Sequence, residues 1–232
     1  MRNDHPVRGR LPVGAQHVAR GVLSLAMMCV GTAAQAQSAG LDVQRFTPAA
    51  GGSHNYNQVE GAGVVGHLRP TFGFYLNYAH VPLVATRTGE TVELLSYDVG
   101  LDVMAGLGIG KRFQLGIALP FTAQQANGSS ESIEVPQVAA RTLGDLRIEP
   151  KFKLAGGARG GLAIAVPVTL PTGSPADYHG EVSLTYEPRL IAELPIGERL
   201  RIGANLGYLI RQPQSVLTLT STNELQYGLG LA

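Results

Sequence analysis

The segment from Tyr97 to Phe121 constrains the fold more than any other part of the chain. Two runs in which apolar residues alternate with small or polar ones flank a tight turn at residues 108–111. Because side chains along a strand point alternately to opposite faces of a sheet, these runs predict a hairpin with two unlike faces. Leu101 and Leu115 are typical of one face, and Asp102 is typical of the other. Such a hairpin also fits a soluble sandwich, but its length and its small polar-face residues favour a membrane barrel.

The same alternation recurs along the chain. It predicts further strands at about 71–79, 145–154, 161–170, 181–194 and 199–211, and from 223 onward. Short connections (108–111, 156–160, 195–198) alternate with longer ones (80–90, 124–144, 171–180, 212–222). Outer-membrane barrels combine short periplasmic turns with longer external loops. We therefore predict an all-β fold, an antiparallel up-and-down transmembrane β-barrel of eight or more strands, over residues 69–232.

Two features fit this pattern less well. Pro120, Pro150, Pro167 and Pro188 lie inside predicted strands, where each removes one N–H from the hydrogen-bond ladder, so we expect them at bulges or strand ends. The chain also stops at Ala232 in mid-pattern and without a terminal aromatic residue. This ending leaves open whether the barrel is truncated at its C-terminus.

The first 36 residues predict a signal peptide. A basic stretch ending at Arg20 precedes a short apolar run, 21–31, and a small-x-small cleavage site at 34–36. The apolar run is shorter than the roughly 20 residues that a membrane-spanning helix needs. Cleavage would remove the single cysteine, Cys29, and with it any disulfide or thiol chemistry. Residues 37–68 lack a regular pattern, and we expect a periplasmic lead-in there.

Several short motifs resemble known envelope proteins. Residues 41–46 (LDVQRF) and 74–84 (FYLNYAHVPLV) resemble the N-terminal barrel regions of outer-membrane proteins of the OmpA family in myxobacteria-like lineages. Residues 144–147 (GDLR), with Lys151, and 166–173 (VPVTLPTG) are similar both to that group and to transporter barrels of the phenol-degradation meta-pathway type. In the OmpA-type group, calcium-binding repeats and a peptidoglycan-binding domain follow the barrel. This sequence contains neither, and the resemblance supplies no catalytic residues.

The polar face of the predicted strands is rich in charged residues. If the apolar face contacts lipid, this polar face lines the lumen. The predicted lumen-facing residues are Asp98, Asp102, Arg112, Asp145, Arg147, Glu149, Lys151, Lys153, Glu187, Arg189, Glu193 and Arg201. They could bias which solutes pass, as rings of charge do in channels. They could instead fill a narrow barrel with mutual salt bridges, which we favour because side chains fill small barrels.

Other site chemistry finds little support in the sequence. The net charge of +1 offers no basic field for nucleic acid. None of the histidines has a nearby His or Cys at the spacing of metal ligands. His80 and His179 are expected at solvent-exposed strand ends. Asp98 and Asp102 would lie roughly 13 Å apart along a strand, too far for paired acid–base work. We therefore predict no enzyme, no cofactor and no metal site.

These observations predict an outer-membrane protein with a structural role in the envelope or a role in passive solute passage. Its expected partners are outer-membrane lipid, the barrel-assembly machinery and small solutes, with no nucleic acid. The main alternative is a soluble secreted barrel that binds a small apolar ligand, and an outer-membrane barrel enzyme is a third. A ligand binder would need an apolar interior, whereas the predicted interior is charged and glycine-rich.

Overall fold

The computed structural model describes residues 42–44, 46–51, 55–87, 90–126, 137–157, 160–216 and 219–232. The predicted signal peptide, residues 1–36, lies outside these ranges. The described chain forms an antiparallel all-β fold, with a single 3-10 turn, η1 (Pro175–Asp177). Its strands are β1 (Pro70–Arg87), β2 (Glu90–Ile109), β3 (Phe113–Ala126), β4 (Arg141–Leu143), β5 (Leu146–Ala155), β6 (Gly161–Ala165), β7 (Val168–Leu170), β8 (Thr185–Tyr186), β9 (Arg189–Ile196), β10 (Leu200–Leu209), β11 (Gln214–Val216), β12 (Leu219–Ser221) and β13 (Glu224–Leu231).

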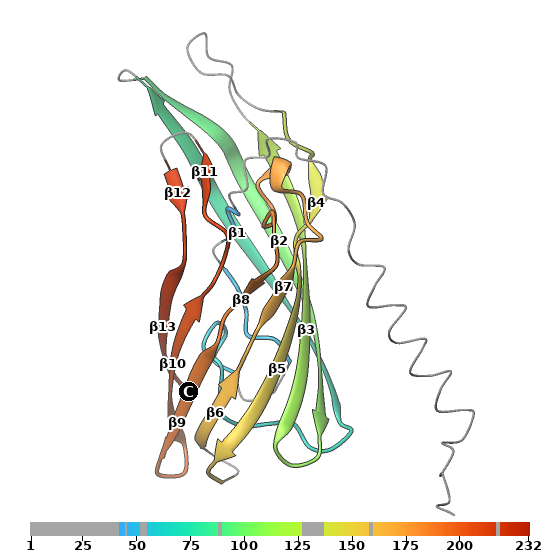
Figure 1. The fold of residues 1–232 in the computed structure, drawn as a ribbon, viewed down its shortest axis with the longest axis vertical. Coiled ribbons are helices and arrows are strands. Elements are labelled where there is room, and N and C mark those ends of the chain that lie inside the picture. The colour runs from blue at the N-terminus through green and yellow to red at the C-terminus, as the bar shows by residue number, and fades with distance from the viewer. Residues whose placement is uncertain are drawn as a thin grey trace, which may run out of the picture. The chain divides into compact units, whose positions relative to one another are not determined.

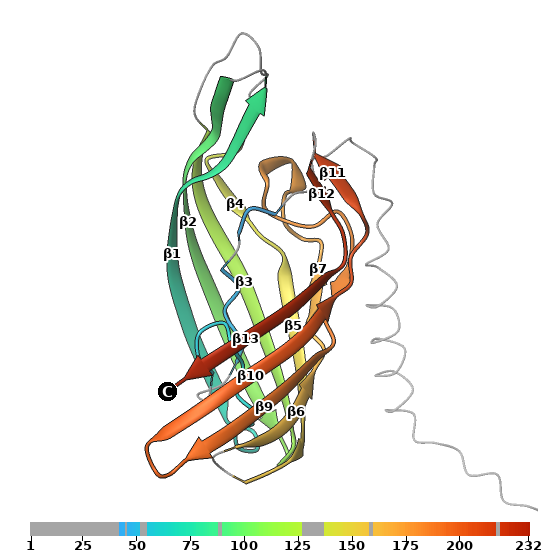
Figure 2. The same cartoon turned by 90° about the vertical axis from the view of Figure 1, so that its left-hand side faces the viewer.

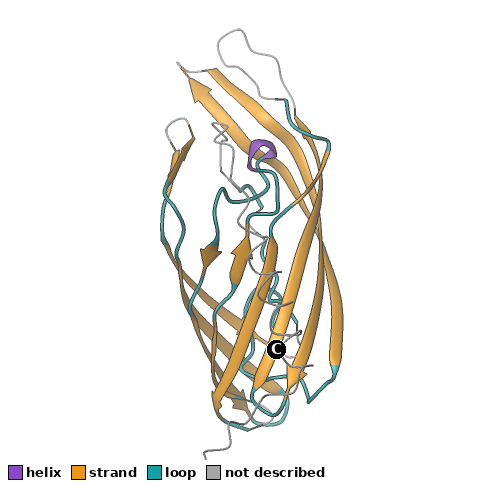
Figure 3. Ribbon diagram, turned by 45° about the vertical axis from the view of Figure 1, so that its right-hand side comes forward, coloured by secondary structure: helices purple, strands orange, loops and turns teal. Residues whose placement is uncertain are grey.

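The main sheet is a meander that curls into a half-barrel (Figure 1). Its order is β1-β2-β3-β5-β6-β9-β10-β13, so these strands follow one another across the sheet in chain order. The short strand β4 pairs with β3, β7 pairs with β5 and β8, and β11 and β12 form a separate two-stranded sheet. The strands β1 and β13 form the two edges, and no hydrogen bonds join them in the described chain. The prediction of an antiparallel up-and-down sheet is confirmed, whereas closure into a complete barrel is not observed. Figure 3 shows the strands curving around an irregular segment.

Short turns and long connections separate to opposite ends of the sheet. The turns β2–β3, β5–β6 and β9–β10 lie at the lower end in Figure 1, and η1, β4, β11 and β12 lie at the upper end. The long loop predicted at 80–90 is wrong. Instead, β1 continues to Arg87 and β2 begins at Glu90, with register shifts between His80 and Val84 that absorb the irregularity.

Three of the four prolines, Pro150, Pro167 and Pro188, form a row across neighbouring parts of the sheet, whereas Pro120 lies five residues along β3 from Leu115, the partner of Pro150. Pro167 and Pro188 lie in the breaks between β6 and β7 and between β8 and β9, while Pro120 and Pro150 remain inside β3 and β5. Each proline carbonyl accepts a hydrogen bond from the next strand along. The donors, in the same order along the chain, are the N–H groups of Gly144 to Pro120, Val166 to Pro150, Glu187 to Pro167 and Tyr208 to Pro188, at 2.9–3.1 Å. The expectation of strand ends is therefore met at two of the four prolines.

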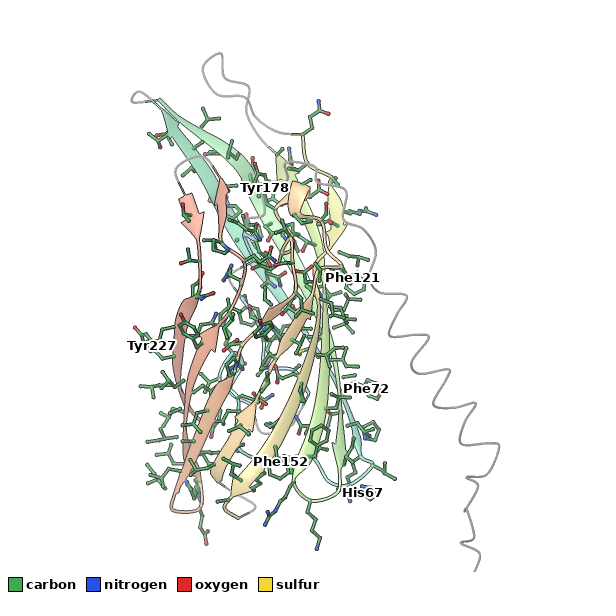
Figure 4. All side chains as sticks on the ribbon, in the orientation of Figure 1. His67, Phe72, Phe121, Phe152, Tyr178 and Tyr227 are labelled. Carbon is green, nitrogen blue, oxygen red and sulfur yellow. The ribbon has the colours of Figure 1, made fainter. Side chains whose placement is uncertain are left out.

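The two faces of the sheet differ as the alternation predicts. Large apolar side chains point outward and are exposed on almost every long strand; Phe72 and Tyr227, for example, are each 83% exposed. Figure 4 shows both of these rings on the convex side. The concave face carries glycine, alanine and polar residues, among them the buried Gln114 and Ala118 of β3. Polar groups are therefore buried and apolar groups exposed.

Candidate lumen and the segment inside it

The chain ahead of β1 runs along the concave face of the sheet (Figure 2). We call the described part of residues 42–66 the inner segment. It belongs to the same compact unit as the sheet, and residues such as Ala50, Glu60 and Ala62 have no exposed surface. A periplasmic lead-in ahead of the barrel was expected at residues 37–68. The described part of that stretch instead occupies the space that the curled sheet encloses.

Glycines of the wall make room for the inner segment. A Cβ on Gly106 would lie 2.6 Å from Cα of Gly51, and one on Gly116 would lie 2.9 Å from the carbonyl oxygen of Ala50. At the other side of the half-barrel, a Cβ on Gly203 or Gly230 would lie 2.8 Å from the side chain of Tyr56. The glycine-rich polar face is therefore a contact surface for the chain's own backbone.

A buried ion-pair cluster joins the middle of the inner segment to the wall. Oε1 of Glu60 lies 2.9 Å from Nζ of Lys151 on β5, and Oε2 lies 3.5 Å from Arg189 on β9. Arg189 also forms a bidentate pair with Glu187, at 2.8 and 2.9 Å. Glu149 is buried beside these groups, 3.7 Å from Nε of Arg147. Three bases and three acids thus meet at one level of the lumen.

A second cluster lies nearer the β9–β10 turn. The hydroxyl of Tyr56 donates to Oε1 of Glu193 at 2.6 Å, and the guanidinium of Arg201 donates to the same oxygen at 3.0 Å. Arg201 also stacks over the Tyr56 ring, 5.3 Å from its centroid. The other carboxylate oxygen of Glu193 accepts the Ala62 N–H at 3.0 Å. One wall carboxylate therefore holds two points of the inner segment.

The upper end of the lumen contains a third set of polar contacts. Gln44 donates to both carboxylate oxygens of Asp102 at 3.2 Å. The imidazole of His179 lies 3.1 Å from the side-chain oxygen of Gln124 and 3.5 Å from Asp98. His179 has no exposed surface, so the prediction that it is wet is wrong. Its burial lowers its pKa to about 4.

Several carboxyl groups lie close to the beginning of the inner segment. Desolvation, together with repulsion from Asp145 and Glu181, raises the pKa of Asp42 to about 7. Glu181 pairs with Arg211 at 2.8 Å, and Arg211 also pairs with Glu224 at 2.9 Å. The upper lumen therefore holds more carboxyl groups than basic groups to neutralise them.

The structure places most of the predicted lumen residues on the concave side. Asp98, Asp102, Asp145, Glu149, Lys151, Glu187 and Glu193 are buried, and Arg147, Arg189 and Arg201 are largely covered. Lys153 is half-buried near the β5–β6 turn. Arg112 differs from the others, because it is exposed in the turn between β2 and β3.

A cavity of about 650 Å³ remains between the inner segment and the wall. Its charged lining residues are Asp42, Asp102, Asp145, Glu181, Glu187, Glu224, Arg147, Arg189 and Arg211. Carboxyl groups outnumber guanidinium groups there by six to three. An enclosure with this lining attracts small cations more strongly than anions.

Several site residues were missed by the sequence analysis. Glu60 and Tyr56 lie in a stretch without periodicity, so nothing marked them as part of the lumen. A signal was available for Glu60, which is the only acid between Asp42 and Glu90. Arg211 continues the odd-numbered inward series of β10, and its parity with Arg201 could have identified it.

No known protein family, curated protein or solved structure matches the chain. Among the described residues, no helix has the length and apolarity needed to cross a membrane. The same residues contain no cluster of three or more His, Cys, Asp or Glu side chains that could bind a metal ion.

Proposed function

We propose that this chain forms an outer-membrane β-barrel wall through which small polar solutes pass passively. The observation that carries the proposal is the inverted distribution of polarity. Soluble monomers rarely expose a contiguous apolar patch larger than a few hundred Å². Here apolar side chains cover the convex face from Phe72 on β1 to Tyr227 on β13, while Glu149 and Lys151 are buried on the concave face.

Backbone hydrogen bonding supports the same proposal. A lipid-facing sheet must satisfy its N–H and C=O groups internally, because hydrocarbon offers no partners. Antiparallel ladders join the strands from β1 to β13, which leaves the outer edges of β1 and β13 as the two unpaired edges of this path in the described chain. The prolines, which cannot donate, still accept hydrogen bonds through their carbonyls. A tilted spanning strand needs about 9–11 residues. The strands β1, β2, β3, β5 and β10 reach this length, whereas β6, β9 and β13 are shorter.

The lining of the lumen suggests which solutes would pass. The cavity is polar and its carboxyl groups exceed its guanidinium groups by six to three. Fixed charges in a low-dielectric enclosure concentrate ions of opposite sign. We therefore expect small cations and polar cationic solutes to pass in preference to anions. The apolar-ligand alternative has less support, because nine charged residues line this cavity.

The location and partners belong to the same proposal. Residues 1–36, with their basic start, apolar run and small-x-small site, are typical of an exported protein. An exported chain with an apolar convex sheet would be delivered to the outer membrane by the barrel-assembly machinery and surrounded there by lipid. A purely structural envelope role is the second candidate, favoured by the inner segment that fills much of the lumen.

Reconstitution separates these candidates. The full chain is folded in detergent, transferred to phosphatidylcholine vesicles, and recorded in planar bilayers under a tenfold KCl gradient. Discrete conductance steps with a reversal potential of the cation-selective sign are expected for passage. Glu224→Gln, at the cavity, should reduce this selectivity, and Glu198→Gln, in the exposed β9–β10 turn, should not. A folded, vesicle-bound protein without conductance favours the structural role, and a chain that stays folded in water without detergent refutes membrane insertion.

A further inference from the structure

We infer that the inner segment is a gate, held shut by the Glu60 contacts with Lys151 and Arg189 and able to leave the wall while the sheet stays intact. This inference rests on the proposed passage function and adds its regulation. Four observations support it: the way the segment is attached, the nature of its contacts, the charges that remain when it leaves, and its connection to β1.

The inner segment is attached mainly through side chains. Its links to the wall include Gln114 to Gly51 and Val65, Asn205 to Glu60, and Lys151 to Gly61. None of its residues pairs in the main sheet, and its one ladder-type bridge, Tyr56 with Val59, is internal. The segment can therefore depart without breaking a single strand–strand hydrogen bond.

Polar contacts dominate this interface. Part of the apolar contact consists of small side chains, such as Ala50 against Ala118 and Ala62 against Ala163 and Ala165. Larger contacts are made by Val43, which packs with Leu95 and Tyr178, and by Phe46, whose ring lies against Tyr75. Small side chains bury little apolar area, so they contribute little to holding the segment in place. The ion pairs and hydrogen bonds can exchange their partners for water once the segment leaves, because net stabilisation by such pairs is modest. Release of the segment should therefore cost less free energy than unfolding of the sheet.

After release, two acids, Glu149 and Glu187, stay on the wall beside the three bases of the cluster. Arg189 already has a bidentate partner in Glu187, on its own side of the lumen. Glu149 lies within electrostatic reach of Lys151, Arg189 and Arg147. Its two carboxylate oxygens accept no hydrogen bond in the docked state. Glu149 is therefore the group that replaces Glu60 as the partner of Lys151 when the gate opens.

A tether at the lower end keeps the released segment attached. Leu68 donates its N–H to the Gly108 carbonyl at 2.8 Å, and His67 accepts the Gly110 N–H at 2.9 Å. Leu68 has a positive φ of 55°, which reverses the chain direction just before β1. Glycines at positions 61, 63 and 66 precede this point and leave the backbone above it free to swing.

A reversible cross-link tests the gate directly. The variant Ala50→Cys/Gly116→Cys is made in a Cys29→Ser background, which has no other cysteine. A Cβ on Gly116 lies 3.1 Å from Cβ of Ala50, and a disulfide needs about 3.5–4.5 Å, so a small shift closes the bond. A matched control, Ile117→Cys/Ile148→Cys, joins two outward-facing partners on β3 and β5. Conductance is then recorded before and after adding reductant to the same preparation.

The gate predicts a specific set of results. Reduction should raise conductance at least fivefold in the Ala50–Gly116 pair and leave the Ile117–Ile148 pair unchanged. Glu60→Gln should raise conductance severalfold, and the oxidised cross-link should abolish that rise. A conductance that is indifferent to the cross-link in both backgrounds overturns the gate.

A second readout separates the gate from the channel. Ala62→Cys, with no exposed surface in the docked state, is labelled with a polar maleimide in the presence and absence of Glu60→Gln. Suppose that Glu60→Gln accelerates labelling at least tenfold but that no variant conducts ions in bilayers. This result refutes the passage function and supports release of the segment. Labelling that Glu60→Gln does not change refutes release, whatever the conductance.

Discussion

Nζ of Lys151 lies 2.9 Å from Oε1 of Glu60, and neither side chain has more than 1% of its surface exposed. The two residues are far apart in sequence, and their pairing fixes the inner segment at the middle of the lumen. A buried charge that loses its partner is costly, whereas removing both charges together costs far less. This asymmetry leads to the first prediction.

Glu60→Ala should weaken docking of the inner segment by about 3–5 kcal/mol, because Lys151 and Arg189 lose their shared partner. Native-state hydrogen exchange measures this loss. The Ala62 and Val65 amides, which donate to Glu193 and Gln114, should exchange roughly 100-fold to 4,000-fold faster. The double variant Glu60→Leu/Lys151→Met should recover most of the protection. Equal exchange in the single and double variants would contradict a dominant role for the ion pair.

Gly116→Val should destabilise the docked state by about 1–3 kcal/mol, as overpacking does in a filled interior. The added Cβ would lie 2.9 Å from the Ala50 carbonyl oxygen, so the inner segment must shift to make room, and the two methyl groups of valine add to the crowding. Urea unfolding in detergent measures the loss. Gly157→Val is the matched control, since nothing lies within 4 Å of a Cβ there. If both variants lose the same stability, a general cost of replacing glycine, rather than contact with the inner segment, explains the loss.

Tyr56→Phe should cost about 1.5–3 kcal/mol, the usual contribution of a hydrogen bond to a charged group. Its hydroxyl donates to Glu193 at 2.6 Å. Tyr75→Phe removes a comparable bond, 3.0 Å to Asn57, at an exposed position, where water replaces the lost partner. The difference between the two unfolding free energies should be at least about 1 kcal/mol. A smaller difference would place Tyr56 outside the set of residues that hold the inner segment.

Ile117→Arg tests the outward face. This side chain is 41% exposed in the middle of β3, and an arginine at the bilayer midplane destabilises a barrel by about 2–4 kcal/mol. Ile109→Arg, 43% exposed at the end of β2, should cost about 0–1 kcal/mol near the interface. Both are measured by urea unfolding from vesicles. A loss that does not depend on position would argue against a lipid-facing belt.

The pH dependence of stability should contain two opposing contributions. The pKa of His179 falls from 6.5 to about 4 on folding, so its contribution is present above pH 6.5 and is lost as pH falls toward 4. The pKa of Asp42 rises from 3.8 to about 7, so its contribution is present below pH 3.8 and is lost as pH rises toward 7.

Single replacements separate these two contributions. Relative to the unmodified chain, Asp42→Asn should make the unfolding free energy rise more steeply between pH 4 and 6.5, by up to about 1.4 kcal/mol per pH unit. His179→Gln should make it fall more steeply over the same interval. Urea midpoints at several pH values provide the test. Parallel pH profiles for all three proteins would show that neither group titrates as its surroundings indicate.

The alternation in the sequence predicted the strands of the wall but not the segment that fills the lumen. A two-residue period assigns Asp98, Asp102 and Glu149 to one face, since the period is a local property of a strand. The position of the inner segment depends on contacts such as Tyr56 with Gly230, which no local pattern records. His179 was misplaced for a similar reason, because the residues that cover it, Gln124 and Asp98, come from distant strands.

The proline row has a consequence for assembly. Alternation of polarity rejects a strand that slips by one residue, because every side chain would change face, but it tolerates a slip of two residues. A two-residue slip would move the carbonyl of Pro150 or Pro167 away from its present hydrogen-bond donor. It would also place the proline nitrogen, which carries no hydrogen, opposite a carbonyl that now has a donor. The prolines therefore disfavour slipped pairings and restrict successive strands to a single register as the sheet assembles.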